Sequence, residues 1–458
     1  MSEFPFAINN HVAIASEMMQ MRLPLNREYH TLLSELCYEE WEKCKAKVTG
    51  LVGREINVGS PKQVNEFLYQ ELKLKAKHKY GKEETTSDEN ALRELRVEYP
   101  QHAKVLNAFI EERHIKKKIE SYIQIEIDED GYIPYSANPA GTETNRWSFS
   151  KSPRGRGFNV QTAPKAMRIM ADAPIGRVFI CPDLPQADAR IVAWDAKCER
   201  LIELFLNPKI HFHLENCIRL FGISREEAYG KDANGVPWKE RDVRYTTGKA
   251  MGHAANYRMA AKRLAMELGI EVKEAQRLLN VYLFQLYPEI PRWHGTILER
   301  LRKTGGLETP EPFLRKRTFY KAWGELMMRG KLSNQTHNEA CAHIPQSVVA
   351  DIINTGMERL WEAKDYVRFH KHDHDSYLAS VPVGRLGDAV RCAMDSLKVT
   401  LKIHGRPLTM LPEMQWGFNY GLMQEWKGEE EASYDQWWAK AEKKLDREQL
   451  RKDLYGYY

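Results

Sequence analysis

Residues 177–190 have the sequence RVFICPDLPQADAR, in which a short apolar run of β type ends in a carboxylate, Asp183. A helix is expected to follow the run, opened by Pro185. A carboxylate at the C-terminal end of a strand projects into the crevice beside a sheet, where catalytic or metal-binding groups usually lie. Many strand-end aspartates merely cap the next helix. This stretch therefore predicts a strand–helix unit and leaves the role of Asp183 open.

A second stretch, YVRFHKHDHDSYLASVPV at 366–383, predicts two short strands around a polar turn. Alternate residues of an extended chain share a face, so His370, His372 and His374 would lie on one face and Asp373 and Asp375 on the other. One hypothesis is a His-rich zinc site, although no H-x-x-x-H or H-E-x-x-H helix supplies further ligands. The other hypothesis is a hairpin that presents a carboxylate.

A third stretch, TTGKAMGHAANYRMAAKRLAMELGI at 246–270, has the pattern of a helix. A face that repeats every four residues would carry Arg241, Tyr245, Lys249, His253 and Tyr257. Cations for phosphates and rings for a base and a sugar suit a nucleotide. The alternative is an ordinary amphipathic helix with a solvated face.

Residues 128–165 are rich in Gly, Pro, Ser and Asn, and they interleave aromatic with basic side chains. The aromatic residues are Trp147, Phe149 and Phe158, and the basic residues are Arg146, Lys151, Arg154 and Arg156. This mixture suits a surface laid along a nucleic-acid backbone, and the alternative is a solvated loop. Taken together, two carboxylates on separate strands and a lysine on a helix face indicate phosphoryl transfer assisted by two metal ions.

The composition limits the class of protein. The 458 residues are 43% apolar and 29% charged, and their net charge of +5 permits a polyanionic partner without demanding one. No run of about 18 apolar residues predicts a membrane span, and the first ten residues lack the plan of a signal peptide. The seven cysteines are scattered without a C-x-x-C pair, which argues against a disulfide framework and favours a reducing cytosol.

Three motifs resemble, in family order, those of the family A (DNA polymerase I-type) DNA polymerases. CPDLPQADAR (181–190) resembles motif A, GKAMGHAANYRM (248–259) resembles motif B, and HDS (374–376) resembles the motif C hairpin. The matching functional positions are Asp183, Gln186 and Arg190 in motif A, Lys249 and Tyr257 in motif B, and His374 and Asp375 in motif C. The resemblance implies that Asp183 and Asp375 bind the catalytic metals.

Smaller segments extend the resemblance over about residues 15 to 425. TETNRWS (142–148) resembles the segment that holds the primer–template, and NVQTAP (159–164) resembles the segment after it. IHFH (210–213) resembles the entrance to the fingers, and PQSVVADII (345–353) resembles a template-contacting helix. GSPKQVNEFLYQEL (59–72) resembles part of the thumb, and LPEMQWGFNYGLM (411–423) resembles the C-terminal strand. The resemblance implies DNA contacts at Arg146, Asn159, Gln161, Arg190, Gln346 and His374, and a nucleotide contact at His211.

The sequence departs from the family pattern in motif B. Tyr245 stands where the family has an arginine, so Arg244 or Arg241 would have to reach the γ-phosphate of the nucleotide. His253 stands where the family has Phe or Tyr, and Arg258 where it has Gly.

Motifs A and C also depart from the family pattern. Asp188 replaces the glutamate that excludes ribonucleotides, and Pro185 replaces a serine. Ser376 replaces the glutamate after the catalytic aspartate of motif C. Asp373 competes with Asp375 for that role, and the spacing back from SYLASVP favours Asp375.

The resemblance implies an α+β fold of right-hand polymerase type, with a thumb, a palm built on an antiparallel sheet, and helical fingers. The expected parts are a thumb at 1–130, a palm at 131–205 and 330–427, fingers at 206–329, and a C-terminal helix at 428–458. This division leaves no room for a 3′–5′ proofreading domain. A polymerase core with such divergent motifs also suggests a phage or phage-derived gene.

The implied activity is template-directed addition of dNTPs to a primer 3′ end by a cytoplasmic monomer, in the host cytoplasm if the gene is phage-encoded. Two Mg²⁺ ions, for which Mn²⁺ can substitute, are expected at Asp183 and Asp375, and Lys249 is expected to contact phosphates and to protonate the leaving pyrophosphate. The expected nucleotide contacts are Tyr257, His253, Asp188, Gln186, His211 and either Arg241 or Arg244.

The expected partners are primer–template DNA, dNTPs, and a separate exonuclease or replication accessory protein. Two alternatives stay open at this point. A single-subunit RNA polymerase shares the palm but is disfavoured by the acidic Asp188 at the sugar-gating position. A non-catalytic DNA-binding module is disfavoured because both aspartates and the lysine are present.

Overall fold

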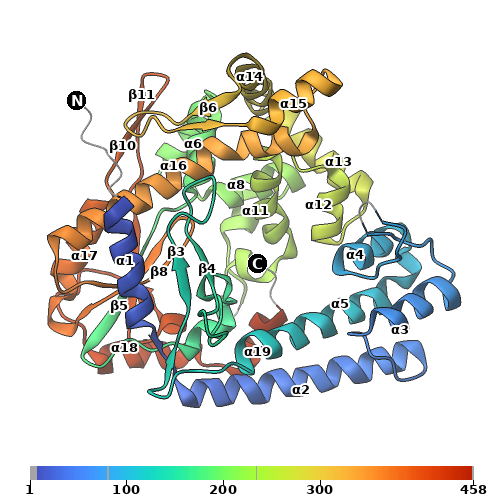
Figure 1. Ribbon diagram of the computed structural model, residues 1–458, viewed down its shortest axis with the longest axis horizontal. Helices are drawn as coiled ribbons and strands as arrows, with labels where there is room; N and C mark the ends of the chain where they lie inside the picture. Colours follow the sequence, from blue (N-terminus) through green and yellow to red (C-terminus); the bar gives the residue numbers. More distant parts are fainter. Residues whose placement is uncertain (1–7, 80–81, 234, 456–458) are drawn as a thin grey trace.

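The computed structural model describes residues 8–79, 82–233 and 235–455, and its fold is α+β, as predicted. Residues 1–7 of the predicted thumb and 456–458 of the predicted C-terminal helix lie outside the described residues. Figure 1 shows a small sheet covered by helices, with a long helical arm extending to one side. No helix in the described part of the chain is both long enough and apolar enough to cross a membrane.

A five-stranded antiparallel sheet lies at the centre, in the order β13–β12–β5–β9–β8. The strands are β5 (Arg177–Asp183), β8 (Arg368–His372), β9 (Tyr377–Pro382), β12 (Glu413–Gly417) and β13 (Gln424–Glu425). The middle residues of β5, Val178, Phe179 and Ile180, are fully buried in succession. Both faces of this strand are therefore covered, which accounts for its continuous apolar sequence.

Four helices cover the sheet. They are α1 (Ile8–Met21), α6 (Ala187–Asp195), α16 (Asn334–Ala363) and α17 (Leu386–Ser396). α16 lies against α6 and α17, α1 lies against β8, and α17 lies against β5 and β9. The middle of α16 is buried almost without interruption and includes Pro345. This helix packs against α1, α6 and α17, and its Gln346 lies beside Tyr257.

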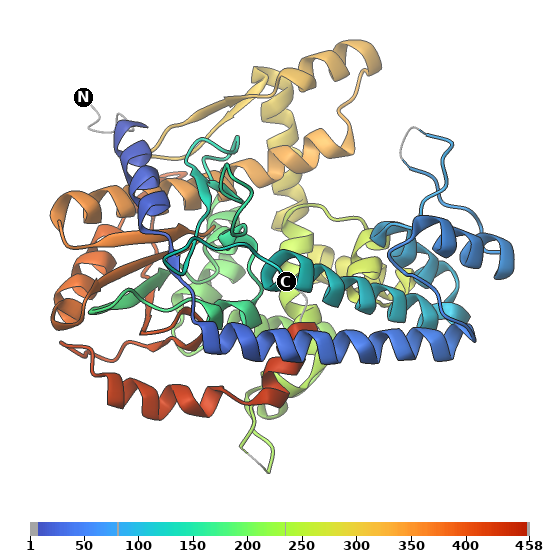
Figure 2. The same ribbon diagram turned by 60° about the horizontal axis from the view of Figure 1, so that its bottom comes forward.

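The helical arm is built on two long helices, α2 (Arg27–Val52) and α5 (Ala103–Lys118), with the shorter α3 (Pro61–Asn65) and α4 (Glu89–Glu98) at its far end. The Asn26 side chain accepts the N–H of Tyr29 and begins α2, and Gly53, at φ +84°, ends it. The arm has an apolar cluster of its own around Phe67, Leu92 and Phe109. It is therefore a separately packed part of the fold (Figure 2).

A second group of helices, one of which packs against α4 of the arm, corrects one expectation. These helices are α7 (Glu199–Leu206), α8 (Phe212–Phe221), α9 (Arg225–Tyr229), α10 (Trp238–Arg241), α11 (Val243–Asn256), α12 (Ala261–Leu268), α13 (Val272–Asn280) and α14 (Glu289–Thr304). The prediction of one helix over 246–270, extended backwards to Arg241, is wrong. The Asp242 carboxylate accepts the N–H of Arg244 and begins α11, so Arg241 belongs to a separate one-turn helix.

The break after α11 has a local cause. Arg258 adopts a left-handed backbone, at φ +58°, and the N–H of Met259 returns to the carbonyl of Ala254. A new helix, α12, begins two residues later. Because neither glycine nor proline marks this turn, the sequence pattern gave no signal of it.

The C-terminal region also differs from the prediction of a single helix at 428–458. It forms two helices, α18 (Tyr434–Ala441), capped by Ser433, and α19 (Arg447–Tyr455). α19 lies against the arm, where Arg451 pairs with Glu39 over 2.7 Å and the Tyr455 hydroxyl donates to Glu40 over 2.7 Å. The last described helix thus packs against α2, the first long helix of the arm.

Candidate active site

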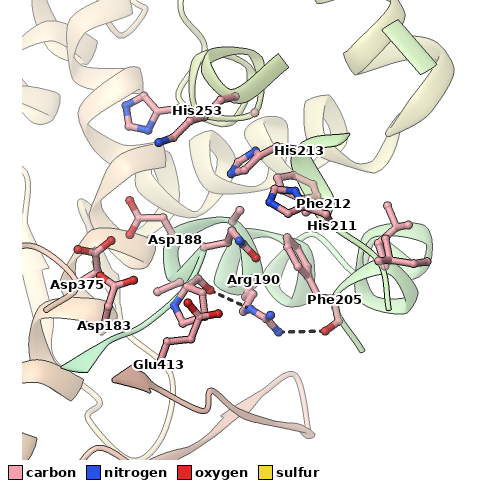
Figure 3. A pocket seen from close by; sticks show the side chains of 18 of the residues that line it. Asp183, Asp188, Arg190, Phe205, His211, Phe212, His213, His253, Asp375 and Glu413 are labelled. Atoms are coloured by element: carbon pink, nitrogen blue, oxygen red, sulfur yellow. Dashed lines mark hydrogen bonds between the residues drawn. The ribbon is translucent and has the colours of Figure 1, made fainter. Parts of the chain in front are cut away.

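An open cleft of about 1030 Å³ lies between the end of the central sheet, α6 and α11. The predicted site residues that line it are Asp183, Gln186, Asp188, Arg190, Arg146, His211, Lys249, His253, Tyr257, His374 and Asp375. The predicted site residues that do not line it are Arg241, Arg244, Asn159, Gln161 and Gln346. Figure 3 shows the carboxylates on one wall and the histidines on the other.

Asp183 and Asp375 lie at the same end of the sheet. Asp183 ends β5, and Asp375 lies in the turn between β8 and β9. The Leu184 N–H donates to the Asp375 carbonyl over 2.9 Å, and Asp183 forms a bridge with Ser376. Backbone pairing, rather than side-chain contact, therefore holds the two carboxylates together (Figure 3).

Both carboxyl groups have a raised pKa. Burial raises the pKa of Asp183 to about 7, and the charges of Asp375, Glu413 and Asp373 raise it further. Burial likewise raises the pKa of Asp375 to about 6, with Asp373 and Asp188 as the next causes. Shifts of this kind arise where carboxylates share a partly dry site that lacks positive charge. A bound cation would relieve this repulsion.

The donor set suits a hard divalent cation. Within 8–79, 82–233 and 235–455, no three His, Cys, Asp or Glu side chains converge to form a metal site by themselves. Mg²⁺ is commonly held by one or two carboxylates, while substrate phosphates and water complete its coordination. Asp183 and Asp375 fit that pattern. Two histidines of the zinc hypothesis, His370 and His372, are buried in hydrogen bonds with other side chains.

The Asp373 carboxylate forms a salt bridge with a buried lysine. The carboxylate pairs with the Lys371 ammonium over 2.6 Å, and Lys371, fully buried, also donates to the Tyr420 hydroxyl over 2.8 Å. A buried lysine requires such a counter-charge. Asp373 therefore neutralises Lys371, whereas Asp375 lines the cleft. This difference favours Asp375 as the second catalytic carboxylate.

Glu413 is a third carboxylate at this end of the sheet, and the sequence analysis missed it. It begins β12 directly opposite Asp183 in the strand pairing, and it lines the cleft. Figure 3 shows its side chain beside Asp183. Since 230 residues separate the two positions in the chain, only the register of β12 on β5 brings them together. The segment 411–423 was matched to the family's C-terminal strand, but Glu413 was not singled out within it.

Asp188 and Tyr257 form a hydrogen-bonded pair on the wall between the carboxylates and α11. The Tyr257 hydroxyl donates to the Asp188 carboxylate over 2.7 Å, and the Arg146 guanidinium lies 3.6 Å from the same carboxylate. Burial and the Asp188 charge raise the pKa of Tyr257, while a hydrogen bond with Gln346 opposes the rise. The His253 ring stands edge-on to the Tyr257 ring, with centroids 4.6 Å apart. This arrangement fixes the position of the phenol.

Lys249 and two histidines occupy the opposite wall of the cleft. The exposed Lys249 makes no ion pair with any residue in the described ranges. Burial lowers the pKa of His213 to about 4, and the neighbouring His211 and Lys249 lower it further. Both imidazoles are therefore neutral near pH 7, since burial also lowers the pKa of His211. Lys249 and the exposed Lys209, which also lines the cleft, are thus free among the described residues to meet an anionic ligand.

Arg241 and Arg244, the predicted contacts for the γ-phosphate, both lie outside the cleft lining. Arg244 is engaged by two carboxylates, Asp242 over 2.7 Å and Glu227 over 2.8 Å. Arg241 is exposed at the end of α10 and does not share a helix face with Lys249. Neither arginine therefore lies at the position that the family resemblance implied for it.

Several of the predicted DNA contacts are also used within the fold. Asn159 accepts the N–H of Gln161, and the Gln161 amide donates to the carbonyls of Trp147 and His372 over 3.3 and 3.1 Å. Arg190 donates to the carbonyls of Pro185 and Phe205, each over 3.1 Å, and lies over the Phe205 ring. These contacts, two of them visible in Figure 3, stabilise the walls of the cleft.

The turn from β5 into α6 holds Gln186 in a left-handed backbone, at φ +52°. This conformation is uncommon for a residue other than glycine. Such positions concentrate at functional sites, where the surrounding structure imposes them. The turn places Gln186 in the cleft lining, directly after Pro185 and three residues after Asp183.

An antiparallel sheet that presents two carboxylates into a cleft, beneath a helix with a free lysine, defines the class of palm-containing nucleotidyl transferases. Residues 27–406 match the family model described as DNA polymerase family A, and the chain belongs to that family.

Known proteins support this assignment. The chain is 29% identical over 370 residues to DNA polymerase I of Borreliella burgdorferi. The aligned region covers 78% of this chain and 37% of that relative. It is 27% identical over 398 residues to the thermostable DNA polymerase I of Thermus aquaticus, with coverage of 84% and 44%. The chain thus spans less than half the length of these relatives.

A solved structure shares the fold. The POL domain of Pol1 from M. smegmatis, in complex with DNA primer-template and dNTP, superposes with a TM-score of 0.69 at 21% identity. The match covers 90% of this chain and 70% of that one. The right-hand polymerase fold expected from the sequence is thereby confirmed.

The raised pKa of Asp183 gives a stability prediction. Its folded pKa of about 7 exceeds the unfolded value of about 3.9. Ionisation of Asp183 therefore lowers the free energy of unfolding by its full amount above pH 7. The effect shrinks as the pH falls from 7 to 4, and it is absent below pH 4. In thermal melts with a chelator at pH 8, Asp183→Asn should raise Tm by roughly 2–5 °C, and the gain should vanish near pH 4. The exposed Asp365→Asn serves as the control and should leave Tm unchanged at both pH values.

Proposed function

We propose that this chain extends the 3′ end of a DNA primer on a DNA template, using dNTPs. The observation that carries the proposal is the meeting of Asp183, Asp375 and Lys249 in one cleft. Membership of DNA polymerase family A supports it. The solved POL domain that shares the fold was captured with DNA primer-template and dNTP, which supports the same two ligands for this cleft.

The parts of the fold would have the roles of the thumb, palm and fingers of a right-hand polymerase. We assign the helical arm within 1–130 to the thumb, the sheet with its covering helices at 131–205 and 330–427 to the palm, and the helices at 206–329 to the fingers. The C-terminal helices within 428–458 are a separate part that follows the palm in the chain. The separate apolar cluster of the arm supports treating it as a part of its own.

The carboxylate wall would hold divalent cations. Asp183 and Asp375 are the residues that would bind two Mg²⁺ ions, or Mn²⁺ in their place. When bound, such ions stabilise the charge on the attacking and leaving oxygens of an in-line phosphoryl transfer. Glu413, opposite Asp183, adds negative charge beside this position.

The chain's own side chains would bind and orient the nucleotide. Lys249 faces the carboxylate wall from α11 and would neutralise the triphosphate and donate a proton to the leaving pyrophosphate. The hydrogen-bonded Asp188 and Tyr257 would lie against the sugar. His253, His211 and Gln186 would complete the walls around the base and phosphates.

The primer–template would be held from the palm side. Arg146 and His374 line the cleft, and Gln346 lies beside the Tyr257 hydroxyl. The segment that carries Arg146 is anchored because Asn145 donates to the buried Asp351 over 2.9 Å. We therefore place the primer terminus near these residues.

Primer extension tests the proposal. A labelled primer annealed to a template should lengthen in the presence of Mg²⁺ and dNTPs, following the template sequence, and should remain unchanged without template. Extension with rNTPs in preference to dNTPs would indicate a single-subunit RNA polymerase. DNA binding without any incorporation would indicate a non-catalytic binding module.

A further part of the proposal is that the 458-residue chain adds nucleotides without removing them. The described elements are accounted for by thumb, palm and fingers, with the C-terminal helices in addition. A single-stranded primer with a mismatched 3′ end should therefore stay intact in Mg²⁺ without dNTPs. The assay is gel analysis over several hours. Steady 3′–5′ shortening that persists in Asp183→Asn would show a second, nuclease site.

Sugar selection is expected to depend on Asp188. The carboxylate is one methylene shorter than the family glutamate, and its contact with Tyr257 holds it in place. Since one methylene changes discrimination by only about 1–3 kcal/mol, the enzyme should prefer dNTPs less strictly than a glutamate-bearing relative. Asp188→Ala should lower the ratio of kcat/KM for dNTP over rNTP by about 10- to 100-fold, and Asp188→Glu should raise it.

The control for this prediction is Tyr257→Phe, which removes the hydroxyl that donates to Asp188 and keeps the ring. It should weaken discrimination less than Asp188→Ala, since the carboxylate remains. If Asp188→Ala discriminates as well as the wild type, Asp188 is not the gate.

A further inference from the structure

The helix α15 (Tyr320–Arg329) exposes an unusual number of large apolar side chains. Tyr320 is 83% exposed, Trp323 47%, and Met327 85%. Their spacing of three and four residues puts these three side chains on one face of the helix. Ala322, on the opposite face, is fully buried. The exposed face is therefore the outward side of a docked helix.

The Trp323 indole on this face is held in place. A side chain at Gly305 would collide with it, since a Cβ there would lie 2.1 Å from its Nε1. Gly305 has φ +68° and ends α14, so the indole covers the last turn of that helix. One edge of the ring is thus fixed, while 47% of the residue remains exposed. A pre-positioned aromatic surface costs little entropy when it binds a flat ligand.

Positive charge surrounds the aromatic face. Lys321, Arg329 and Lys331 are exposed, and none of them makes an ion pair with another residue of the described part of the chain. The one acidic residue of α15, Glu325, instead accepts hydrogen bonds from Ser333 and Thr336. The surface is therefore aromatic and net cationic, and Glu325 is the one carboxylate that α15 contributes beside it.

The elements on both sides of α15 connect it to the cleft. Before it, Arg315 donates to the carbonyl of Thr144, and Arg317 pairs with Glu143, both in the segment that carries Arg146. After it, α16 contacts the fingers. Asn338 on α16 accepts a hydrogen bond from Arg258, which follows Tyr257 in the chain.

The figures agree with this placement. In Figure 1 α15 lies at the upper edge of the molecule beside α14, and in Figure 2 the same gold-orange helix projects from that edge.

We propose that the exposed face of α15 binds the single-stranded template ahead of the cleft, with bases stacked on Tyr320 and Trp323 and phosphates near Lys321 and Lys331. The inference rests on the proposed polymerase function. Unpaired bases expose the flat surfaces that aromatic side chains bind, and nearby cations track the backbone. Duplex DNA offers no such surfaces, and a second copy of the chain would bring like charges together.

The test compares primer–templates that differ in the length of the unpaired template. Fluorescence anisotropy should show that the wild type binds a substrate with an overhang of about twelve nucleotides roughly tenfold more tightly than one with about two. The double variant Tyr320→Ala/Trp323→Ala should lose this gain and bind both substrates equally. Because Trp323 also covers α14, Tyr320→Ala alone should lose part of the gain, and Trp323→Phe should keep most of it.

The matched control is Tyr434→Ala, which removes another half-exposed ring on α18, far from α15 in Figure 1. It should keep the full dependence on overhang length. Extension of the short-overhang substrate by the double variant separates the two proposals. Normal extension with the gain lost supports the template surface, whereas no extension by the wild type would overturn the polymerase function itself.

Three results would overturn the template surface. The first is an unchanged overhang dependence in the double variant. The second is an equal loss of affinity for both substrates, which would indicate a contact with the duplex. The third is a wild-type dimer in sedimentation that the double variant abolishes, which would identify a second copy as the occupant.

Discussion

Asp183→Asn and Asp375→Asn should each lower the rate of nucleotide addition by at least about a thousandfold, because divalent cations contribute several kcal/mol to the stabilisation of phosphoryl-transfer transition states. The two carboxylates meet at the end of β5 and the β8–β9 turn, where burial and the neighbouring carboxylates raise the pKa of each. Asparagine keeps the side-chain shape and removes the charge. Affinity for DNA should be nearly unchanged, since most of it comes from phosphate contacts elsewhere.

The measurement is single-turnover incorporation of one dNTP at saturating DNA, with anisotropy for DNA affinity. Glu413→Gln is the matched control, because Glu413 lies opposite Asp183 in the strand pairing. It should reduce the rate by less than about tenfold, since the two aspartates still provide the carboxylates that Mg²⁺ commonly needs.

Asp373→Asn tests the assignment of the second carboxylate. It should lower Tm, because Lys371 would be left buried without its counter-charge, and it should retain activity below that temperature. If Asp373→Asn is inactive while folded and Asp375→Asn is active, the assignment of motif C is wrong.

The positions of Asp183 and Asp375 in one cleft were predictable from sequence because each is defined by its immediate neighbours. An apolar run that ends in Asp183 and a polar turn between two apolar runs that contains Asp375 are local patterns, and β5, β8 and β9 form where those patterns predict strands. The α+β class and the family followed from the same motifs. The predicted phage origin and monomeric state stay predictions.

Other features of the site depend on contacts between distant segments and could not be predicted. Glu413 reaches Asp183 only through strand register, and Lys371 accounts for Asp373 only once both side chains are placed. The turns at Asp242 and Arg258 interrupt a pattern that suggests a continuous helix, because the Asp242 side chain caps the start of a new helix and the left-handed Arg258 follows the end of that helix. A periodic sequence therefore indicated which residues share a face only within α11 itself.

The break at Asp242 changes what is expected of the positive charges that face the triphosphate. Arg244 is held by Asp242 and Glu227, and Arg241 lies on another helix. Neither residue lines the cleft, so Arg241→Ala and Arg244→Ala should each leave kcat/KM for dNTP within about threefold of the wild type, which is the range of a surface substitution. Lys249 is then the cation that α11 contributes to the cleft, where it would meet the phosphates.

Lys249→Ala should lower kcat/KM for dNTP by about 10²- to 10³-fold, the effect of removing one pre-positioned donor from a developing charge. The cation acts on the bound triphosphate and on the leaving pyrophosphate, so KM should rise and kcat should fall together. Lys249→Arg keeps the charge and loses the compact ammonium, and it should recover the KM more than the kcat if proton donation matters. The measurement is steady-state and single-turnover incorporation with each dNTP. Wild-type kinetics for Lys249→Ala, together with a large loss for Arg241→Ala or Arg244→Ala, would mean that the fingers rotate those arginines into the cleft when the nucleotide binds.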